Sequence, residues 1–194
     1  MKKAAALIIF VLIIISLPAC SNLRGAEEVA QDIRVSVIGA ETIDMNMKLR
    51  ADYGEKASDF ELHFTGNENE SIIDVISPPS IAGFQIVISG GEVNTEFDGV
   101  SLYMGKLSEI DETPACAVAS IITAWKSGYI TNSKFELYDN KETVALTICI
   151  TDASETRTWF DKETLLPIHA ELISEGKAIL FCDFSDVSFR ADNA

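Results

Sequence analysis

The sequence has few of the residue patterns that carry enzyme chemistry. It contains only two histidines, His63 and His169, and each stands among polar and acidic neighbours where a surface position is expected. Two isolated histidines make a poor metal site. Neither a Gly-x-Ser-x-Gly nucleophile motif nor a glycine-rich phosphate-binding loop is present. We therefore predict that the protein is not an enzyme and that it holds no metal or cofactor.

Positive charge is also scarce. The chain has 15 lysines and arginines against 30 aspartates and glutamates, a net charge of -15. Without Lys2 and Lys3 the basic count is 13 (15 minus 2) against 30, so the net charge of the remainder is -17. Such a surface repels nucleic acids and anionic lipid head groups. We predict no nucleic-acid partner, and any protein partner should offer a basic or an apolar face.

The four cysteines do not form a recognisable metal site. Cys20, Cys116, Cys149 and Cys182 are far apart in the sequence, whereas zinc ligands come in closely spaced pairs. Three remain if Cys20 is modified, and an odd number cannot all pair within one chain. Their apolar neighbours favour burial of these three as small hydrophobic residues. A disulfide between Cys149 and Cys182 is the alternative.

The sequence lacks an apolar run long enough to cross a membrane. A shorter apolar run stands near its start. Lys2 and Lys3 precede residues 4–17, which are apolar except for Ser16. This run is shorter than the ~20 apolar residues that a membrane-spanning helix needs. A basic start, an apolar run and a small residue before the end, here Ala19, are typical of a secretory signal.

The end of this leader carries a modification motif. Leu17-Pro18-Ala19-Cys20 resembles the bacterial lipobox, in which the cysteine is lipidated on sulfur and becomes the new N-terminus. The resemblance implies a lipoprotein signal peptide at 1–19, the lipidated Cys20 with a tether at 20–25, a folded domain at 26–190 and a tail at 191–194. Two or three acyl chains such as palmitate would hold the domain stably on the extracytoplasmic face of the cell membrane. The alternatives are an ordinary signal peptide or an uncleaved anchor, with Cys20 incidental.

Most of the remaining chain alternates between apolar and polar residues. The clearest case is 42–53, where Ile43, Met45, Met47, Leu49, Ala51 and Tyr53 fall on one face. This period of two predicts a half-buried antiparallel strand. Residues 26–33 fit either a helical turn or the approach to a strand, and we expect the strand period from Val35 onward. Further strands are expected at 57–65, 71–77, 83–89, 92–97, 100–104, 130–138, 142–151, 155–160, 168–174 and 177–184, with 187–190 finishing the last.

Residues 113–126 break the alternation. Thr113 suits a helix N-cap, Pro114 a first helical turn and Gly128 a helix exit. The segment is apolar nearly all round and too short to span a bilayer, so it should be buried on several sides. Consecutive hairpins with short loops give about eleven strands. We therefore predict a mainly β fold: a curled antiparallel sheet forming a half-open β-barrel, with one apolar helix as plug or lid.

Three short motifs resemble a known family. Residues 158–168 (TWFDKETLLPI), 184–189 (FSDVSF) and 76–84 (ISPPSIAGF) are similar to motifs of the LolA-like, lipoprotein-sorting-like domains. Together with the lipobox, the chain looks closest to the GerS-like germination lipoproteins of spore-forming Gram-positive bacteria. These motifs are mainly structural, so they indicate fold more than function.

The resemblance implies an open β-barrel around an apolar cavity with a helical lid. In carrier members that cavity accepts acyl chains. In GerS-like members the domain instead binds and supports a cell-wall amidase in spore cortex modification and germination. A chain that is lipid-anchored itself should not shuttle freely between membranes.

The candidate binding residues are apolar side chains expected to face the concavity. We predict a lining for lipid or acyl chains, and simple core packing is the alternative for each residue. The two methionines suit a lining that adapts in shape. Pairing of the sheet edges into a homodimer is also left open. The candidates are Met45, Met47, Leu49, Tyr53, Phe60, Leu62, Phe64, Trp125, Leu146 and Ile148.

Overall fold

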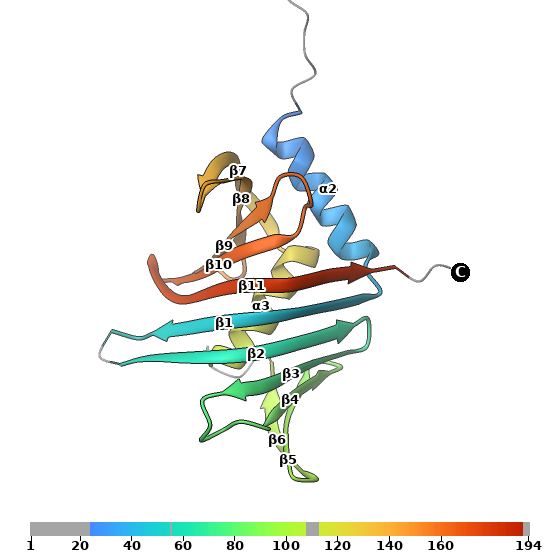
Figure 1. The fold of residues 1–194 in the computed structure, drawn as a ribbon, viewed down its shortest axis with the longest axis vertical. Helices are drawn as coiled ribbons and strands as arrows, with labels where there is room; N and C mark the ends of the chain where they lie inside the picture. The colour runs from blue at the N-terminus through green and yellow to red at the C-terminus, as the bar shows by residue number, and fades with distance from the viewer. Residues whose placement is uncertain (1–23, 55, 108–112, 192–194) are drawn as a thin grey trace, which may run out of the picture.

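One curled antiparallel sheet dominates the computed structural model, which describes residues 24–54, 56–107 and 113–191 (Figure 1). Eleven strands lie in the order β6-β5-β4-β3-β2-β1-β11-β10-β9-β8-β7. The predicted mainly β, half-open barrel is confirmed, since the sheet ends at β6 on one side and β7 on the other. The strands are β1 Thr42–Asp52, β2 Ala57–Asn67, β3 Glu70–Ser77, β4 Gln85–Ser89, β5 Glu92–Phe97, β6 Val100–Lys106, β7 Tyr129–Tyr138, β8 Lys141–Cys149, β9 Ser154–Asp161, β10 Pro167–Ser174 and β11 Lys177–Arg190.

The connectivity follows from local hairpins. Neighbouring strands in the sheet are also neighbours in the sequence, except for β1 and β11. The pairing of these two strands joins a meander of the first six strands to a meander of the last five. The two-residue turns at 98–99, 139–140 and 175–176 all have positive φ at both residues, between 47° and 77°. Positive φ at both residues defines a type I′ turn, whose twist matches that of the two strands of a hairpin. Asp, Asn and Gly adopt positive φ most readily.

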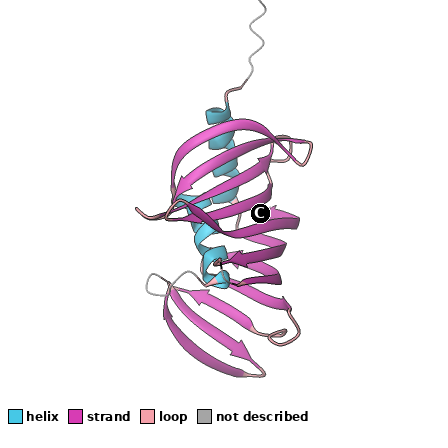
Figure 2. Ribbon diagram, turned by 90° about the vertical axis from the view of Figure 1, so that its left-hand side faces the viewer, coloured by secondary structure: helices cyan, strands magenta, loops and turns pink. Residues whose placement is uncertain are grey.

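Helix α3 (Pro114–Ser127) connects the two edge strands of the sheet and runs along its concave side (Figures 1 and 2). Its predicted ends are confirmed. The Thr113 hydroxyl accepts a hydrogen bond from the Cys116 backbone N–H at 3.4 Å, and the Gly128 N–H donates to the Ala124 carbonyl at 2.8 Å. A Cβ on Gly128 would lie 2.5 Å from Ile148 Cγ2, so only glycine fits this close passage from helix to β7.

The N-terminal segment is a second helix, α2 (Ala26–Gly39), which corrects two predictions. The expected strand period from Val35 onward is wrong, and the described residues contain two helices rather than one. Val29, Ile33 and Val37 are buried, and this spacing of four is helical. The β-branched residues at the end of the helix also suit a strand, which explains the wrong prediction.

A single arginine links the two helices. The Arg34 guanidinium on α2 donates a hydrogen bond to the Gly128 carbonyl at the end of α3, at 2.6 Å. A cation at this position also interacts favourably with the negative end of the helix dipole. This contact joins residues that are 94 apart in sequence and holds α2 against the end of α3.

We expect Arg34→Met to lower the free energy of unfolding by about 1.5–3 kcal/mol, because it removes a hydrogen bond from a charged donor. Arg24→Met is the matched control. It breaks only the exposed 2.7 Å ion pair with Asp32 and should cost no more than about 1 kcal/mol. Urea unfolding of both variants measures the difference, and equal losses would contradict the role given to Arg34.

Candidate functional site

A cavity of about 690 Å³ lies beside α3, at the open side of the half-barrel. We call it the α3 cavity. Its walls come from the β4–β5 turn, the end of β6, one side of α3, the β8–β9 connection and β10. This volume is within the range of small-molecule sites, about 300–1,000 Å³. The lining residues are Gly90, Gly91, Glu92, Lys106, Leu107, Cys116, Ala117, Ser120, Ile150, Thr151, Ser154 and Leu172.

The sidedness of α3 creates this space. Ile121, Ile122 and Trp125 are buried in the core, while the cavity side carries the small residues Cys116, Ala117 and Ser120. Small side chains leave room that large ones would fill. A second hollow of about 420 Å³ shares Leu107, Ser120 and Ile150 with the α3 cavity and extends along the C-terminal half of the helix.

Three polar side chains at the wall are already hydrogen-bonded to the protein, and the charged residues Glu92 and Lys106 also line the cavity. The Ser120 hydroxyl donates to the Cys116 carbonyl at 3.1 Å. The hydroxyls of Thr151 and Ser154 lie 2.7 Å apart, and the Ser154 backbone N–H donates to Thr151 Oγ1 at 3.1 Å. With these groups satisfied and the wall mainly apolar, the cavity suits a hydrocarbon better than a polar ligand.

The predicted lining residues lie mainly in the packed core. Eight of the ten are no more than 3% exposed, and none of the ten lines the α3 cavity. Their role in ligand binding stays a prediction. The eight are Met45, Met47, Leu49, Leu62, Phe64, Trp125, Leu146 and Ile148.

Two of the ten lie elsewhere. Tyr53 falls just beyond the end of β1 and is 49% exposed, so it does not belong to the concave face. Phe60 is partly buried and, with Leu49, borders a hollow of about 410 Å³ whose walls are otherwise largely charged. Cys20, the predicted lipidation site, lies outside the described residues.

The packing of Trp125 explains why the core is full. Its indole N–H donates to Thr158 Oγ1 at 2.9 Å. Phe160 and Phe184 meet the indole edge-on, with ring centroids 5.5 and 5.4 Å away. Such arrangements stabilise aromatic pairs beyond the burial of their area. Trp125 therefore anchors the helix against the sheet, and the α3 cavity lies along the side of the helix that carries Cys116, Ala117 and Ser120.

The alternative disulfide is not formed. Cys116, Cys149 and Cys182 are free thiols. Cys149 ends β8 and Cys182 lies in β11, and two strands separate them in the sheet. Complete burial, with the neighbouring Asp183, raises the pKa of the Cys182 thiol far above its ordinary value, so this group stays protonated.

The two histidines differ from each other. His63 is partly exposed, and its Nδ1 lies 2.9 Å from Asn46 Oδ1. The predicted surface position of His169 is wrong, because this residue is only 6% exposed. Its ring stacks on Tyr138, with centroids 4.9 Å apart, and its Nδ1 lies 2.6 Å from Asp183 Oδ1. Side chains from neighbouring strands cover it, and alternation within its own strand does not reveal them.

Glu136 binds the edge strand β7 to this cluster. Its carboxylate accepts hydrogen bonds from Arg157 at 2.7 Å and from the Trp159 indole, and it pairs with Lys134 at 2.7 Å. Burial raises the pKa of Glu136, but the hydrogen bonds from Lys134, Trp159 and Arg157 outweigh it and hold the pKa below its ordinary value. The cluster is structural in character.

The described residues contain neither a metal-ligand cluster nor a membrane-spanning helix. Within 24–54, 56–107 and 113–191, no group of three or more histidine, cysteine, aspartate or glutamate side chains could hold a metal ion. In the same part of the chain no helix has the length and apolar character to cross a membrane.

Comparison of the sequence with known protein families and with curated proteins finds no match. Solved structures with a similar fold do exist. A DUF1329 family protein from Desulfovibrio piger gives a TM-score of 0.52 at 10% identity, over 87% of this chain and 93% of its own. An uncharacterised conserved protein from Thermus thermophilus gives 0.52 at 10% identity, over 87% and 89%. A LolA superfamily protein from Nitrosomonas europaea gives 0.46 at 13% identity, over 87% and 95%. The likeness is one of fold.

We expect Glu136→Gln to remove a pH-dependent part of the stability. Because the folded pKa of Glu136 lies below its ordinary value of 4.5, the charged carboxylate stabilises the fold above that pH. This contribution is lost as the pH falls from about 4.5 through the folded pKa. Urea unfolding at several pH values should show wild type more stable than the variant at pH 7, with a gap that narrows below pH 4.5. A gap that does not change with pH would contradict the assignment.

Proposed function

We propose that the protein is a non-enzymatic, membrane-anchored lipoprotein that binds a lipid acyl chain in the α3 cavity. The observation that carries the proposal is the cavity itself, which is mainly apolar and whose Ser120, Thr151 and Ser154 hydroxyls are already hydrogen-bonded to the protein. A hydrocarbon chain placed there would remove apolar wall from water without breaking these hydrogen bonds.

The leader supports placement on the extracytoplasmic side of the membrane. Its basic start, apolar run and lipobox-like end at Cys20 together favour export followed by lipidation. A permanently anchored binding domain would present or hold an acyl chain close to the membrane rather than carry it away. The ligand would then come from the same membrane.

Native mass spectrometry tests ligand binding directly. The chain from Ser21 onward, purified from a bacterial host, should show a mass excess equal to a fatty acid or phospholipid. The mass of the polypeptide alone, after gentle purification in the presence of lipid, would contradict the proposal.

Ser120→Phe should block the cavity from within, because Ser120 lines both hollows beside α3. We expect the affinity for a fluorescent fatty acid to fall at least about tenfold, which corresponds to about 1.4 kcal/mol. Gln31→Phe, on the exposed side of α2, is the matched control and should bind like wild type. Equal affinity of the two variants would place the ligand elsewhere.

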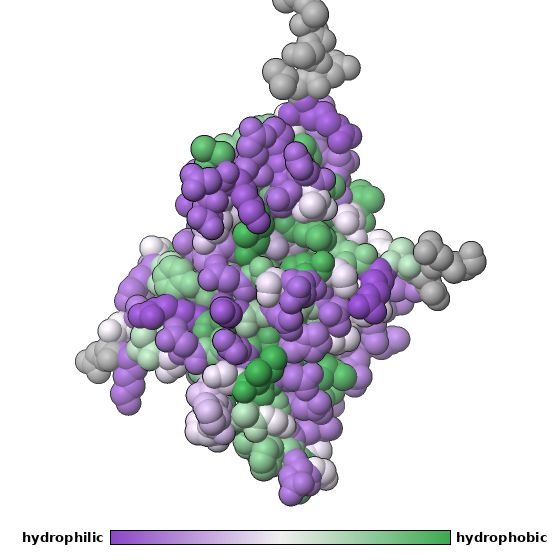
Figure 3. Space-filling view, in the orientation of Figure 1, coloured by the Kyte–Doolittle hydropathy of each residue, from purple (hydrophilic) through white to green (hydrophobic). Residues whose placement is uncertain are grey.

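A second candidate function is that of a GerS-like scaffold for a cell-wall amidase in spore cortex modification. The observation that favours it is the apolar character of the edge strand β6. Leu102 and Tyr103 are more than half exposed, as are Val100 and Met104. An exposed edge strand with apolar side chains can pair with an extended segment of a partner. Figure 3 shows hydrophobic surface toward this end, and further hydrophobic patches lie in the middle and upper parts of the same face.

Leu102→Lys should weaken capture of the amidase at least about tenfold, because a lysine would be buried unpaired in the contact. Val35→Lys is the matched control, since Val35 is equally apolar and 70% exposed but lies on α2. Pull-down of the amidase from sporulating cells measures the effect. Wild-type capture by Leu102→Lys would rule out β6 as the binding edge, and loss of self-association alone in sedimentation would assign the edge to a homodimer.

A further inference from the structure

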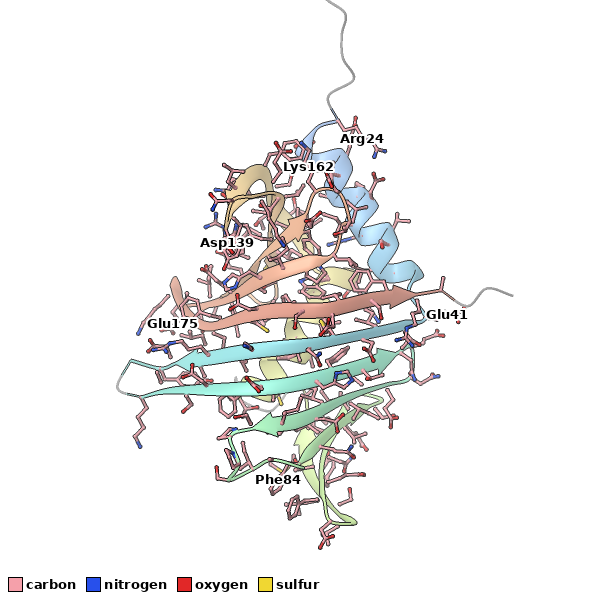
Figure 4. All side chains as sticks on the ribbon, viewed as in Figure 1. Arg24, Glu41, Phe84, Asp139, Lys162 and Glu175 are labelled. Carbon is pink, nitrogen blue, oxygen red and sulfur yellow. The ribbon has the colours of Figure 1, made fainter. Side chains whose placement is uncertain are left out.

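An apolar groove lies at the end of the molecule where the described chain begins. We call it the anchor-end groove. It encloses about 650 Å³ between the start of α2, strands β7 and β8 and the β9–β10 connection. Figure 4 shows Arg24, Lys162 and Asp139 together at this end, with Phe84 at the opposite end of the long axis. The groove is separate from the α3 cavity, with which it shares no lining residue.

The wall of this groove is apolar and open to solvent. Val29, Leu165, Phe135 and Leu137 line it, and the last two are 43% and 70% exposed. Exposed apolar side chains on a hairpin end, beside the amphipathic side chains of Arg24 and Lys162, are typical of a surface in contact with a membrane interface. The Lys162 ammonium lies 5.1 Å from the centre of the Phe135 ring, so the cation already rests on an aromatic face.

Charge is balanced at this groove, although the chain as a whole is strongly acidic. Glu142 pairs with Lys162 at 2.9 Å, and Arg24 pairs with Asp32 at 2.7 Å. Glu136 is neutralised by Lys134 and Arg157, each at 2.7 Å. The lining therefore lacks the uncompensated negative charge that repels a bilayer elsewhere on the chain. Acidic residues close in sequence to the lining, such as Glu163 beside Lys162, favour neutral over anionic lipid.

Chain length brings this end to the membrane. Four residue steps separate Cys20 from Arg24, so even a fully extended chain keeps Arg24, one of the lining residues of the groove, within about 14 Å of Cys20. The exposed apolar side chains are then held at the depth of the lipid head groups.

We propose that the anchor-end groove is a second membrane contact, in which Phe135 and Leu137 insert into the outer surface of the bilayer to which Cys20 is attached. This inference rests on the proposed lipid anchor. The contact orients the domain with its long axis away from the membrane, because the groove and the β4–β6 strands lie at opposite ends (Figures 1 and 4). One lipidated residue tethers the domain, and the groove restricts how it tilts.

Quenching of an introduced tryptophan tests the contact. The full lipidated chain carrying Leu137→Trp is reconstituted in phosphatidylcholine vesicles with brominated acyl chains, which quench fluorescence on contact. Leu102→Trp is the matched control, because Leu102 is also exposed at 63% on an edge strand, but at the far end. Native Trp125 and Trp159 are buried and common to both variants, so wild type supplies the baseline.

We expect the tryptophan at position 137 to lose most of its added fluorescence and the one at 102 to lose none. Vesicle-bound protein without quenching at 137, or with equal quenching at both positions, overturns the contact while leaving the anchor intact. Failure of the wild-type chain to float with vesicles overturns the anchor and the inference with it. Phe135→Trp, checked for wild-type thermal unfolding, repeats the test should Leu137→Trp fail to fold.

Discussion

The packing of Trp125 against the concave face of the sheet determines the position of α3. The helix that carries it connects the two edge strands, β6 and β7, so its position sets how the two halves of the sheet approach each other. The indole is held by Thr158 on β9 and by rings from β9 and β11. A buried aromatic ring with a satisfied N–H is both well packed and specific in orientation, because any other rotation of the helix would leave that N–H unpaired.

Once the helix is seated in this way, the α3 cavity is a consequence of side-chain size. The large residues of α3 fill the concavity of the sheet, and the small ones face the open side of the half-barrel. Apolar lining that is open to water lacks the close contacts with other apolar atoms that a packed core provides, and this exposure is unfavourable. A hydrocarbon ligand would restore those contacts. The same arrangement explains why the strand residues beneath the helix are packed against protein rather than against open space.

Both ends of the molecule expose apolar side chains from an edge strand. The end near Arg24 has a groove with compensated charges that is lined by Phe135 and Leu137 of β7, and the β5–β6 end exposes Leu102 and Tyr103 of β6 (Figure 4). A polar cluster that includes Glu136, which also lines the groove, and His169 stabilises the strands near the Arg24 end. Under the two proposals above, the Arg24 end would face the membrane and the β5–β6 end would face a protein partner.

The sequence alone determined the features that depend on residues close together in the chain. The hairpins follow from turn residues such as Asp98 and Gly99, and the ends of α3 follow from Thr113 and Gly128, because turns and caps are satisfied locally. Helix α2 is harder to predict from the sequence, because the β-branched residues at its end fit both the helical period and the strand period. Whether an inward-facing residue packs against other side chains or lines a cavity depends on contacts between residues far apart in the chain. Alternation shows that Met45 or Phe64 points inward, but the position of α3 decides what it touches. His169 is buried for the same reason: the rings that cover it belong to other strands, and the order of strands in the sheet is a long-range property.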